Sequence, residues 1–280
     1  MVNPWLERRI LNYAHQGGAR EGPSSTLHAM RRAVASGAHA LELDVHATAD
    51  RQLVVCHDAT VDRTTDGTGR IADRTWAEIR CLDNAHWWVP DRVVDHDAAE
   101  DEYTLRGRAP ADPDLRVALL SEVLETFPDT FLNLDIKETA PAVEPYERLL
   151  ADLLREYDRV DDVIVASFSD AAVAAFAAEA PHVSTAAGTT ATAAVYFAVM
   201  QGEAPPATTH HALQVPTSFG GVTVVDERFV SGAHAHGLAV HVWTIDEADE
   251  MHALADLGVD GIMTDRPSVL AEVLRDRAGA

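Results

Sequence analysis

Residues 41–46 read Leu-Glu-Leu-Asp-Val-His, and this alternation is the clearest structural signal in the chain. In a β-strand, residues two apart share a face, so Glu42 and Asp44 stand side by side on a strand whose other face is apolar. Adjacent like charges are costly inside a protein unless a cation neutralises them, and Mg2+ and Ca2+ prefer carboxylate oxygens. The pattern therefore indicates either a cation site or an edge strand with a solvated polar face.

A second apolar run follows at residues 53–55 and ends in Cys56, His57 and Asp58. It places an imidazole where a strand opens into a loop. Residues 63–69 then read Arg-Thr-Thr-Asp-Gly-Thr-Gly, and their Asp-Gly and Thr-Gly pairs are typical of tight turns. A candidate histidine thus lies between a strand and a turn-rich loop.

Strand-like and helix-like segments alternate along the rest of the chain. Apolar runs typical of strands lie at residues 10–14, 39–45, 131–137, 162–168, 182–188, 212–215, 239–245 and 261–265. Helical spacing lies between and after them, at residues 26–36, 121–127, 145–157, 170–180, 190–201, 227–236, 247–257 and 267–277. About eight strands in this alternation predict one α/β domain, residues 1–280, folded as a (β/α)8 TIM barrel. A doubly wound open sheet is the alternative, but no G-x-G-x-x-G follows the first strand.

The periodicity fails across residues 83–116. This stretch contains Trp87, Trp88 and Tyr103 and an acidic cluster at residues 95–102. Irregular loops of this length in a compact domain are lids, binding loops or disordered segments, and disordered segments are poor in aromatic residues. We therefore predict a loop or lid inserted into the barrel.

Polar groups recur at the carboxyl ends of the predicted strands, where barrel enzymes place their active sites. In chain order they are His15, Glu42, Asp44, Asp135, Lys137, Ser167, Trp243 and Asp265. Asp135 and Lys137 also fit a simple salt bridge on a surface strand. The recurrence at several strand ends favours a catalytic site.

These motifs resemble those of the glycerophosphodiester phosphodiesterase family. The matching stretches are Glu-Leu-Asp-Val at residues 42–45, His57-Asp58, residues 63–69, Trp243-Thr244 and Gly-Val-Asp-Gly-Ile-Met-Thr-Asp-Arg-Pro at residues 258–267. The resemblance extends from Ala14 to Pro267. It implies a barrel enzyme that hydrolyses a glycerophosphodiester to glycerol phosphate and an alcohol.

The resemblance also implies roles for individual residues. His15 and His57 would be the general acid and base, because an imidazole with a pKa of about 6.5 transfers protons well at neutral pH. Glu42, Asp44 and Asp135 would hold one divalent cation, Mg2+ or Ca2+. Which histidine is the acid, and whether water or a substrate hydroxyl attacks phosphorus, stays open at this point.

Substrate contacts are implied for Gln16, Lys137 and Trp243. Lys137, the only lysine in the chain, would hold a phosphoryl oxygen, and Trp243 would pack against the rest of the substrate. Gln16 stands where the family has an arginine, residues 23–26 read Pro-Ser-Ser-Thr in place of Pro-Glu-Asn-Thr, and Asp135 replaces a glutamate. An arginine of the insertion, Arg106 or Arg108, is a candidate for the missing positive charge.

The composition limits the partners. The chain has 22 basic and 45 acidic residues and a net charge of −23, which argues against nucleic acid and against stable association with anionic membranes. It has no apolar run long enough to span a membrane, and residues 1–10 lack the apolar core of a secretory signal. Cys56 and Cys81 lack metal-site spacing. We predict a cytoplasmic protein that acts on a small molecule.

Three other functions fit parts of the pattern. A lyase of the sphingomyelinase D type has a similar barrel and a similar acid–histidine site, but it needs an apolar face for lipid. An aldolase-like barrel would use Lys137 to form a Schiff base. A barrel that binds glycerophosphodiesters with weak turnover would explain the missing arginine.

Overall fold

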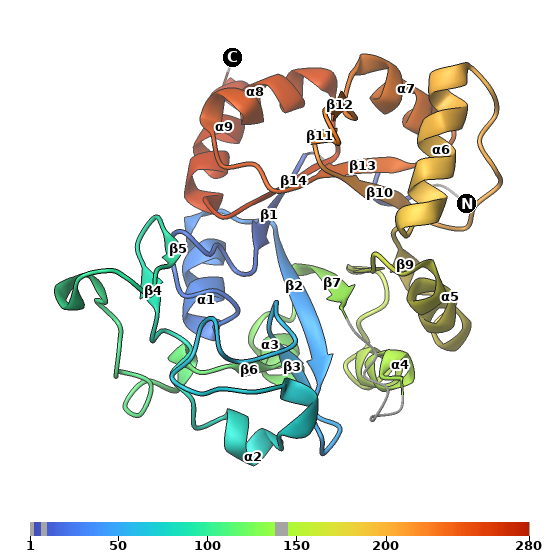
Figure 1. Ribbon diagram of the computed structural model, residues 1–280. Coiled ribbons are helices and arrows are strands. Elements are labelled where there is room, and N and C mark those ends of the chain that lie inside the picture. Colours follow the sequence, from blue (N-terminus) through green and yellow to red (C-terminus); the bar gives the residue numbers. More distant parts are fainter. Residues whose placement is uncertain (1–2, 7–9, 138–144, 280) are drawn as a thin grey trace.

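The computed structural model describes residues 3–6, 10–137 and 145–279, and these residues form a barrel of parallel strands surrounded by helices (Figure 1). The barrel strands are β1 (Leu11–His15), β2 (Ala40–Ala47), β7 (Phe131–Ile136), β8 (Val163–Ala166), β9 (Ser184–Thr185), β10 (Ala212–Val215), β13 (Ala239–Val242) and β14 (Gly261–Thr264). They are hydrogen-bonded in the order β10, β13, β14, β1, β2, β7, β8, β9, and a parallel bridge between Ala186 and Ala212 joins the two ends. The predicted TIM barrel is confirmed.

Helices follow the strands as the spacing predicted. They are α1 (Leu27–Ser36), α3 (Leu120–Thr126), α4 (Glu147–Glu156), α5 (Asp170–Glu179), α6 (Thr189–Gln201), α7 (Glu227–Ala235), α8 (Ala248–Leu257) and α9 (Pro267–Gly279). No helix in this part of the chain has both the length and the apolarity to cross a membrane. Residues 1–2 and 7–9, which belong to the segment predicted to lack a secretory signal, lie outside the described residues.

The alternation in β2 separates two environments. Leu41, Leu43 and Val45 are fully buried in the apolar layer beneath the helices, where each contributes roughly 1.5–3 kcal/mol of burial free energy. The opposite face of β2 projects Glu42 and Asp44 into the barrel. Because β2 lies between β1 and β7, it is not an edge strand, and both of its faces are buried.

The lower part of the barrel interior is filled with apolar and aromatic side chains. Trp5 is fully buried there, and its ring lies edge-on to Phe131 at 6.2 Å and to His241 at 6.1 Å between centroids. Burial lowers the pKa of His241 to about 3, so this histidine is neutral at pH 7. It is a core residue, and the candidate catalytic residues lie at the carboxyl ends of the strands instead.

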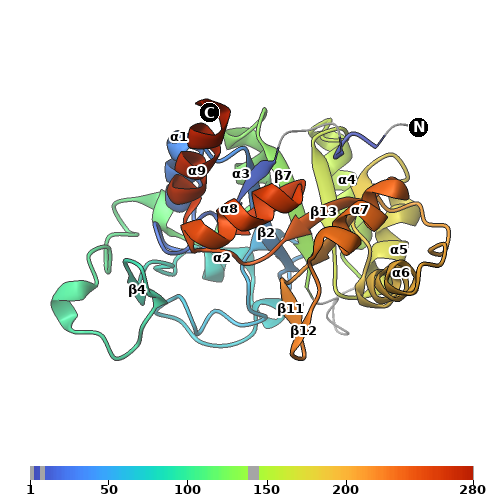
Figure 2. The same ribbon diagram turned by 90° about the horizontal axis from the view of Figure 1, so that it is seen from above.

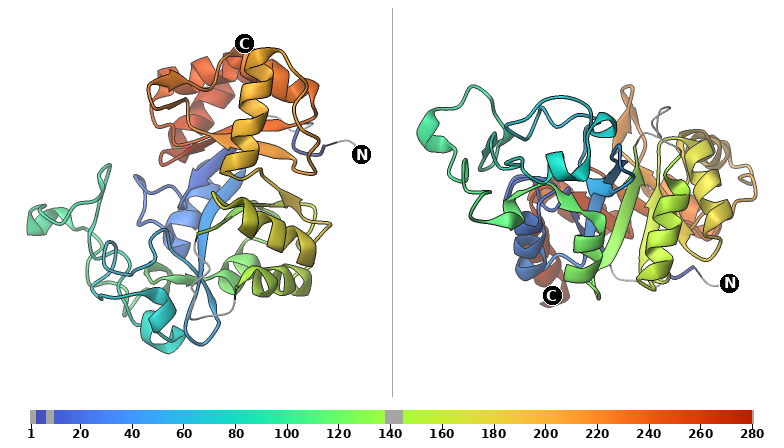
Figure 3. Two further views of the ribbon diagram at one scale, coloured as in Figure 1. Left: turned by 45° about the vertical axis from the view of Figure 1, so that its right-hand side comes forward. Right: turned by 90° about the horizontal axis from the view of Figure 1, so that it is seen from below.

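A long excursion separates β2 from α3. It contains β3 (Leu53–Val55), η1 (Ile71–Asp73), α2 (Trp76–Ile79), β4 (Trp88–Val89), β5 (Val93–Val94), η2 (Glu100–Glu102), η3 (Pro113–Leu115) and β6 (Ala118–Leu119). The predicted insertion, residues 83–116, extends to one side of the barrel (Figures 1 and 3). It is ordered by a small core of Ala85, Ala109 and Leu115.

A hairpin follows β10 and was not predicted. Its strands are β11 (Ser218–Phe219) and β12 (Val222–Thr223), and Figure 2 shows it protruding from the molecule. Gly220 and Gly221 form its two-residue loop with φ values of 57° and 81°, a conformation that favours glycine. The exposed side chains of Phe219 and Val222 flank this loop.

Candidate active site

The carboxyl ends of β1, β2 and β7 bring the predicted acidic residues together. His15 pairs in register with Glu42 on the neighbouring strand, and Asp44 pairs in register with Asp135. Side chains at paired positions of parallel strands point the same way, here into the barrel mouth. The strands themselves therefore place three carboxylates and one imidazole at one end of the barrel.

The ammonium group of Lys137 lies between two of these carboxylates. Its Nζ is 2.9 Å from Asp44 Oδ1 and 2.7 Å from Asp135 Oδ2. Burial opposes the charge on Lys137, but the two carboxylates outweigh it and raise the pKa of the ammonium above its usual value. Burial also raises the pKa of Asp135, although Lys137 counteracts that effect. A surface salt bridge is excluded, since the Asp44 side chain is only 1% exposed.

Glu42 is buried beside Asp44 and needs positive charge. Its Oε2 accepts a hydrogen bond from the backbone N–H of Gln16 at 3.1 Å and lies 3.9 Å from His15 Nε2. Burial first, and then the charge of Asp44, raise the pKa of Glu42 to about 8. A divalent cation would relieve this strain, because it would favour the charged carboxylate.

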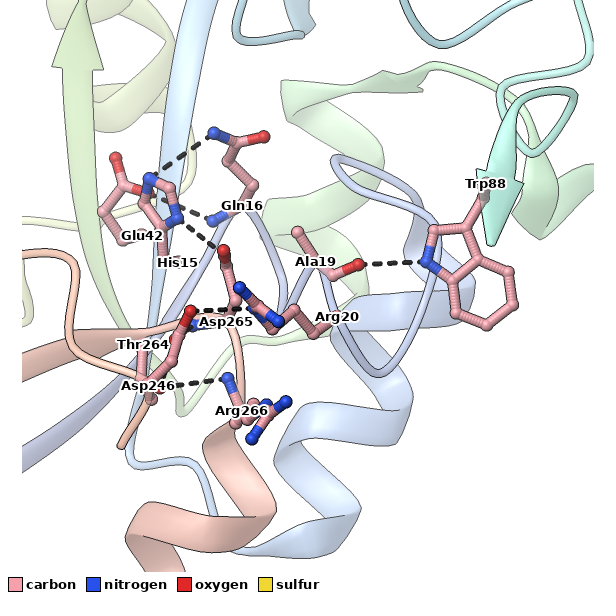
Figure 4. A network of polar contacts seen from close by, with 10 residues as sticks. All are labelled: His15, Gln16, Ala19, Arg20, Glu42, Trp88, Asp246, Thr264, Asp265 and Arg266. Atoms are coloured by element: carbon pink, nitrogen blue, oxygen red, sulfur yellow. Dashed lines mark hydrogen bonds and ion pairs between the residues drawn. The ribbon is translucent and has the colours of Figure 1, made fainter. Parts of the chain in front are cut away.

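His15 is held by an aspartate from the far end of the chain. Its Nδ1 donates to Asp265 Oδ1 at 2.7 Å, which leaves Nε2 on the side of Glu42 and Gln16 (Figure 4). Burial by itself would lower the pKa of the imidazole. The bond to Asp265 and the charge of Glu42 outweigh burial and raise the pKa of His15 to about 9.

His57 has the same kind of support from a neighbour. Its Nδ1 donates to Asp58 Oδ1 at 2.6 Å, and Arg63 Nε donates to the other oxygen of Asp58 at 2.8 Å. The bond from His57, together with Arg63, holds the pKa of Asp58 well below its usual range. A protonated His57 is the weakest of the influences on the pKa of Asp135 and lowers it, so the two groups lie in one electrostatic environment.

Aromatic side chains line another part of the mouth. The ring of Trp243 meets that of Phe168 edge-on at 5.8 Å between centroids, and Phe168 is 61% exposed. Lys137 Nζ lies 5.6 Å from the centre of the Phe168 ring. Phe168 follows β8 and was not among the predicted substrate contacts, although it directly follows Ser167, whose hydroxyl donates to the carbonyl of Ile136.

Gln16 is buried beside His15 with a positive φ of 50°. Its Oε1 accepts no hydrogen bond from the described residues, so the amide has capacity for a ligand. Arg106 does not replace the missing arginine here. Its guanidinium lies over the ring of Tyr103 at 3.4 Å from the centroid and donates to the carbonyl of His86 at 2.8 Å. Arg108 is exposed on the insertion.

The donor set fits a hard divalent cation. Glu42, Asp44 and Asp135 supply only carboxylate oxygens, and Asp44 Oδ2 accepts no hydrogen bond within the described residues. Among the same residues, no three His, Cys, Asp or Glu side chains are arranged to hold a metal ion. The Lys137 ammonium lies between two of the carboxylates. The cation site stays a prediction.

The roles of Asp265 and Asp58 were missed from the sequence. Both residues belong to the motifs that carried the resemblance, but neither was assigned a contact. Asp58 is adjacent to His57, so its role had a local signal. Asp265 lies 250 positions from His15 along the chain, and only the closure of β14 against β1 brings them together.

The comparisons with known proteins agree with this geometry. The sequence model of the Glycerophosphoryl diester phosphodiesterase family matches residues 15–269. This chain belongs to that family. The glycerophosphodiester phosphodiesterase of Caldanaerobacter subterraneus subsp. tengcongensis is 30% identical over 275 residues, which cover 95% of this chain and 98% of that protein.

Two solved structures show the same fold. The glycerophosphoryl diester phosphodiesterase domain of a Mycobacterium tuberculosis protein superposes with a TM-score of 0.77 at 19% identity, covering 96% of this chain and 99% of that chain. An Oleispira antarctica phosphodiesterase, in complex with the product sn-glycerol-3-phosphate, superposes with a TM-score of 0.71 at 20% identity. The superposition covers 95% of this chain and 96% of the Oleispira antarctica chain.

Proposed function

We propose that this protein hydrolyses a small-molecule glycerophosphodiester to glycerol phosphate and an alcohol. Membership of the family supports the reaction class. The observation that carries the proposal is the pair of carboxylate-held imidazoles, His15 with Asp265 and His57 with Asp58, at the mouth that also holds Lys137. A carboxylate at Nδ1 fixes the tautomer and leaves Nε2 for proton transfer.

In this reaction one histidine takes a proton from the attacking oxygen as that oxygen bonds to phosphorus. The other histidine gives a proton to the alcohol oxygen as its bond to phosphorus breaks. The raised pKa of His15 keeps it protonated at pH 7, which favours His15 as the acid and His57 as the base. Lys137 would offset charge on a non-bridging phosphoryl oxygen.

Glu42, Asp44 and Asp135 would hold the divalent cation, Mg2+ or Ca2+. When bound, such an ion polarises the phosphodiester and stabilises the charge that develops on it. The carboxylates themselves are supported in this role by their burial, which is the main cause of the raised pKa of Glu42 and of Asp135 and to which the charge of Asp44 adds. Asp44 and Asp135 would then contact both the cation and the Lys137 ammonium.

The rest of the substrate would lie between Gln16 and the aromatic side. The buried, unpaired Oε1 of Gln16 would accept a hydrogen bond from a hydroxyl group, and Trp243 with Phe168 would pack against carbon atoms. A cytoplasmic location remains a prediction from the sequence.

A lyase of the sphingomyelinase D type is the second candidate, because one observation favours it. The β11–β12 hairpin presents Phe219, 77% exposed, and Val222, 55% exposed, and it follows β10, so it lies on the face that contains the candidate site. An amphiphilic substrate would use such a surface. The Schiff-base alternative is disfavoured, because a raised pKa keeps Lys137 protonated and a protonated amine is not a nucleophile.

Product analysis separates the two candidates. The protein would be incubated in separate reactions with glycerophosphocholine and with lysophosphatidylcholine, each in the presence of Mg2+ or Ca2+. The products would be followed by phosphorus NMR. The proposal predicts glycerol phosphate from glycerophosphocholine as the final product. A cyclic phosphate that accumulates from lysophosphatidylcholine, without turnover of glycerophosphocholine, would establish the lyase instead.

A further inference from the structure

The carboxylate of Asp265 points at His15, and both the N–H and the carbonyl group of Asp265 are hydrogen-bonded. The N–H of Asp265 donates to Asp246 Oδ1 at 2.8 Å, and the carbonyl of Asp265 accepts from the N–H of Arg20 at 3.2 Å. The hydroxyl of Thr264 also donates to Asp246 Oδ1, at 3.1 Å. The direction of the Asp265 side chain therefore depends on Arg20 and Asp246.

Arg20 and Asp246 are bonded to each other. Arg20 Nε donates to Asp246 Oδ2 at 2.9 Å, so one oxygen of Asp246 holds the arginine and the other holds the backbone of Asp265 (Figure 4). We call this ion pair the Arg20–Asp246 clamp. The clamp touches neither the three carboxylates nor the proposed substrate contacts, so an effect on turnover has to pass through Asp265 and His15.

The clamp is also tied to the insertion. Arg20 Nη1 donates to the carbonyl of Asp91 at 2.8 Å, and the N–H of Asp91 donates back to the carbonyl of Arg20 at 3.0 Å. Trp88 Nε1 donates to the carbonyl of Ala19 at 2.9 Å. Asp91 has a φ of 64°, which is costly for a residue other than glycine and persists only where surrounding bonds hold it.

We propose that Arg20 is a positioning residue for the His15–Asp265 pair and that the β4–β5 hairpin of the insertion holds Arg20 in place. The insertion thereby completes the active site without contributing a group to the chemistry. The consequence for turnover rests on the proposed function. The consequence for the His15–Asp265 hydrogen bond does not depend on the proposed function, so the effect on turnover and the effect on this bond can be tested separately.

The test compares Arg20→Met with the parent. Methionine keeps the unbranched stem and removes the guanidinium that joins Asp246 to Asp91. We expect kcat for glycerophosphocholine to fall about tenfold with KM changed less than about twofold, since a small misplacement of a catalytic pair slows the chemical step. In proton NMR, the downfield signal of the His15 Nδ1 proton should weaken or move. Trp88→Phe, which loses one donor, should lower kcat roughly two- to fivefold.

Arg31→Met is the matched control. Arg31 lies on α1, and its Nε donates to Asp114 of the same insertion at 2.9 Å, but none of its contacts reaches Asp265. This variant should keep the parent's kcat and the parent's His15 signal. Similar effects of Arg20→Met and Arg31→Met would overturn the proposal. They would show that Arg20, like Arg31, only attaches the insertion to the barrel.

A double-mutant cycle decides whether Arg20 acts through Asp265. If it does, adding Arg20→Met to Asp265→Asn should cost less than about twofold in kcat beyond the single Asp265→Asn change. Losses that multiply would contradict the proposal. If the parent hydrolyses no glycerophosphodiester, the proposed function fails, while an unchanged His15 Nδ1 signal in Arg20→Met would by itself overturn the positioning role.

Discussion

The two halves of the barrel mouth differ in character although their strands belong to one sheet. The first half, which we call the charged sector, follows β1, β2, β3, β7 and β14 and contains His15, Glu42, Asp44, His57, Asp58, Asp135, Lys137 and Asp265. The second half, the apolar sector, follows β8, β9, β10 and β13 and contains Ala166, Phe168, Ala186, Phe219 and Trp243. Both sectors have an apolar layer beneath their helices.

The difference shows that the fold does not require charge at the strand ends. Small and aromatic side chains close most of the apolar sector, and Asp246, which follows β13, is paired with Arg20. In the charged sector, burial and mutual repulsion raise the pKa of Glu42 and of Asp135, so these groups work against stability unless a cation is present. Such a local conflict inside a well-packed barrel is typical of a functional site. The charged sector should therefore govern kcat and the apolar sector should govern KM.

The largest expected effect is the loss of a charged-sector histidine. His15→Ala and His57→Ala should each lower kcat by roughly 10²–10⁴, because each removes one proton-transfer group. The double variant should lose less than the product of the two, since the groups act in one step. Steady-state kinetics on folded protein measure this. Near-parent kcat in either single variant would remove that histidine from the charged sector's function.

The second largest effect is expected from the loss of Lys137. Lys137→Met should lower kcat by roughly 10²–10³, the usual cost of losing a group that stabilises transition-state charge. Arg159 provides the control, because it is also buried and paired, with Asp162 at 2.7 Å, but at the other end of the barrel. Arg159→Met should destabilise the fold and leave the kcat of the folded fraction near that of the parent. Equal kcat values for the two variants would contradict the division into sectors.

The charged sector should also make stability depend on pH in the absence of a cation. The pKa of Glu42 is raised to about 8 and that of His15 to about 9, so the folded protein binds more protons than the unfolded chain between these values and the ordinary ones. Stability is then full at low pH and falls as pH rises from about 4.5 to about 9.

Urea unfolding in EDTA at pH 5, 7 and 9 measures this dependence. Glu42→Gln should weaken this dependence, because glutamine does not titrate and only the contribution of His15 is left. Added Mg2+ or Ca2+ should stabilise the parent most at high pH, where the carboxylates are charged. Stability that rises with pH over this interval would refute the conflict inferred for the charged sector.

The smallest effect is expected in the apolar sector. Phe168→Ala should raise KM about threefold to tenfold with kcat nearly unchanged, because it removes apolar contact with the substrate and no charge. Phe197→Ala is the control, since Phe197 is 58% exposed and lies on α6, outside the barrel mouth. A fall in kcat for Phe168→Ala comparable to that of the histidine variants would erase the distinction between the sectors.

The contents of the charged sector could be predicted better than its bonds. The alternation in residues 41–46 and 131–137 placed Glu42, Asp44 and Asp135 at strand ends, and regular strand–helix spacing gave the barrel. The local pattern does not state which strands become neighbours, so the contact of Asp265 with His15 and that of Arg20 with Asp246 were not accessible. Long-range pairing, not propensity, decides them.

The apolar sector and the insertion were harder to read for a different reason. Residues 83–116 lack a period, because their order comes from a small core and from the guanidinium of Arg106 on Tyr103. The β11–β12 hairpin is too short for a periodic signal, although Gly220-Gly221 between apolar residues is a hairpin pattern in retrospect. Exposure of Phe168 and Phe219 is a tertiary property that no local pattern encodes.

If the charged sector is a cation-dependent phosphodiesterase site, turnover must require the ion. Release of glycerol phosphate from glycerophosphocholine would be measured on the parent protein in excess EDTA and after Mg2+ or Ca2+ is restored. We expect loss of turnover in EDTA and recovery with at least one of the two ions, and we expect Asp135→Asn to require more ion than the parent. Full turnover in EDTA would contradict it.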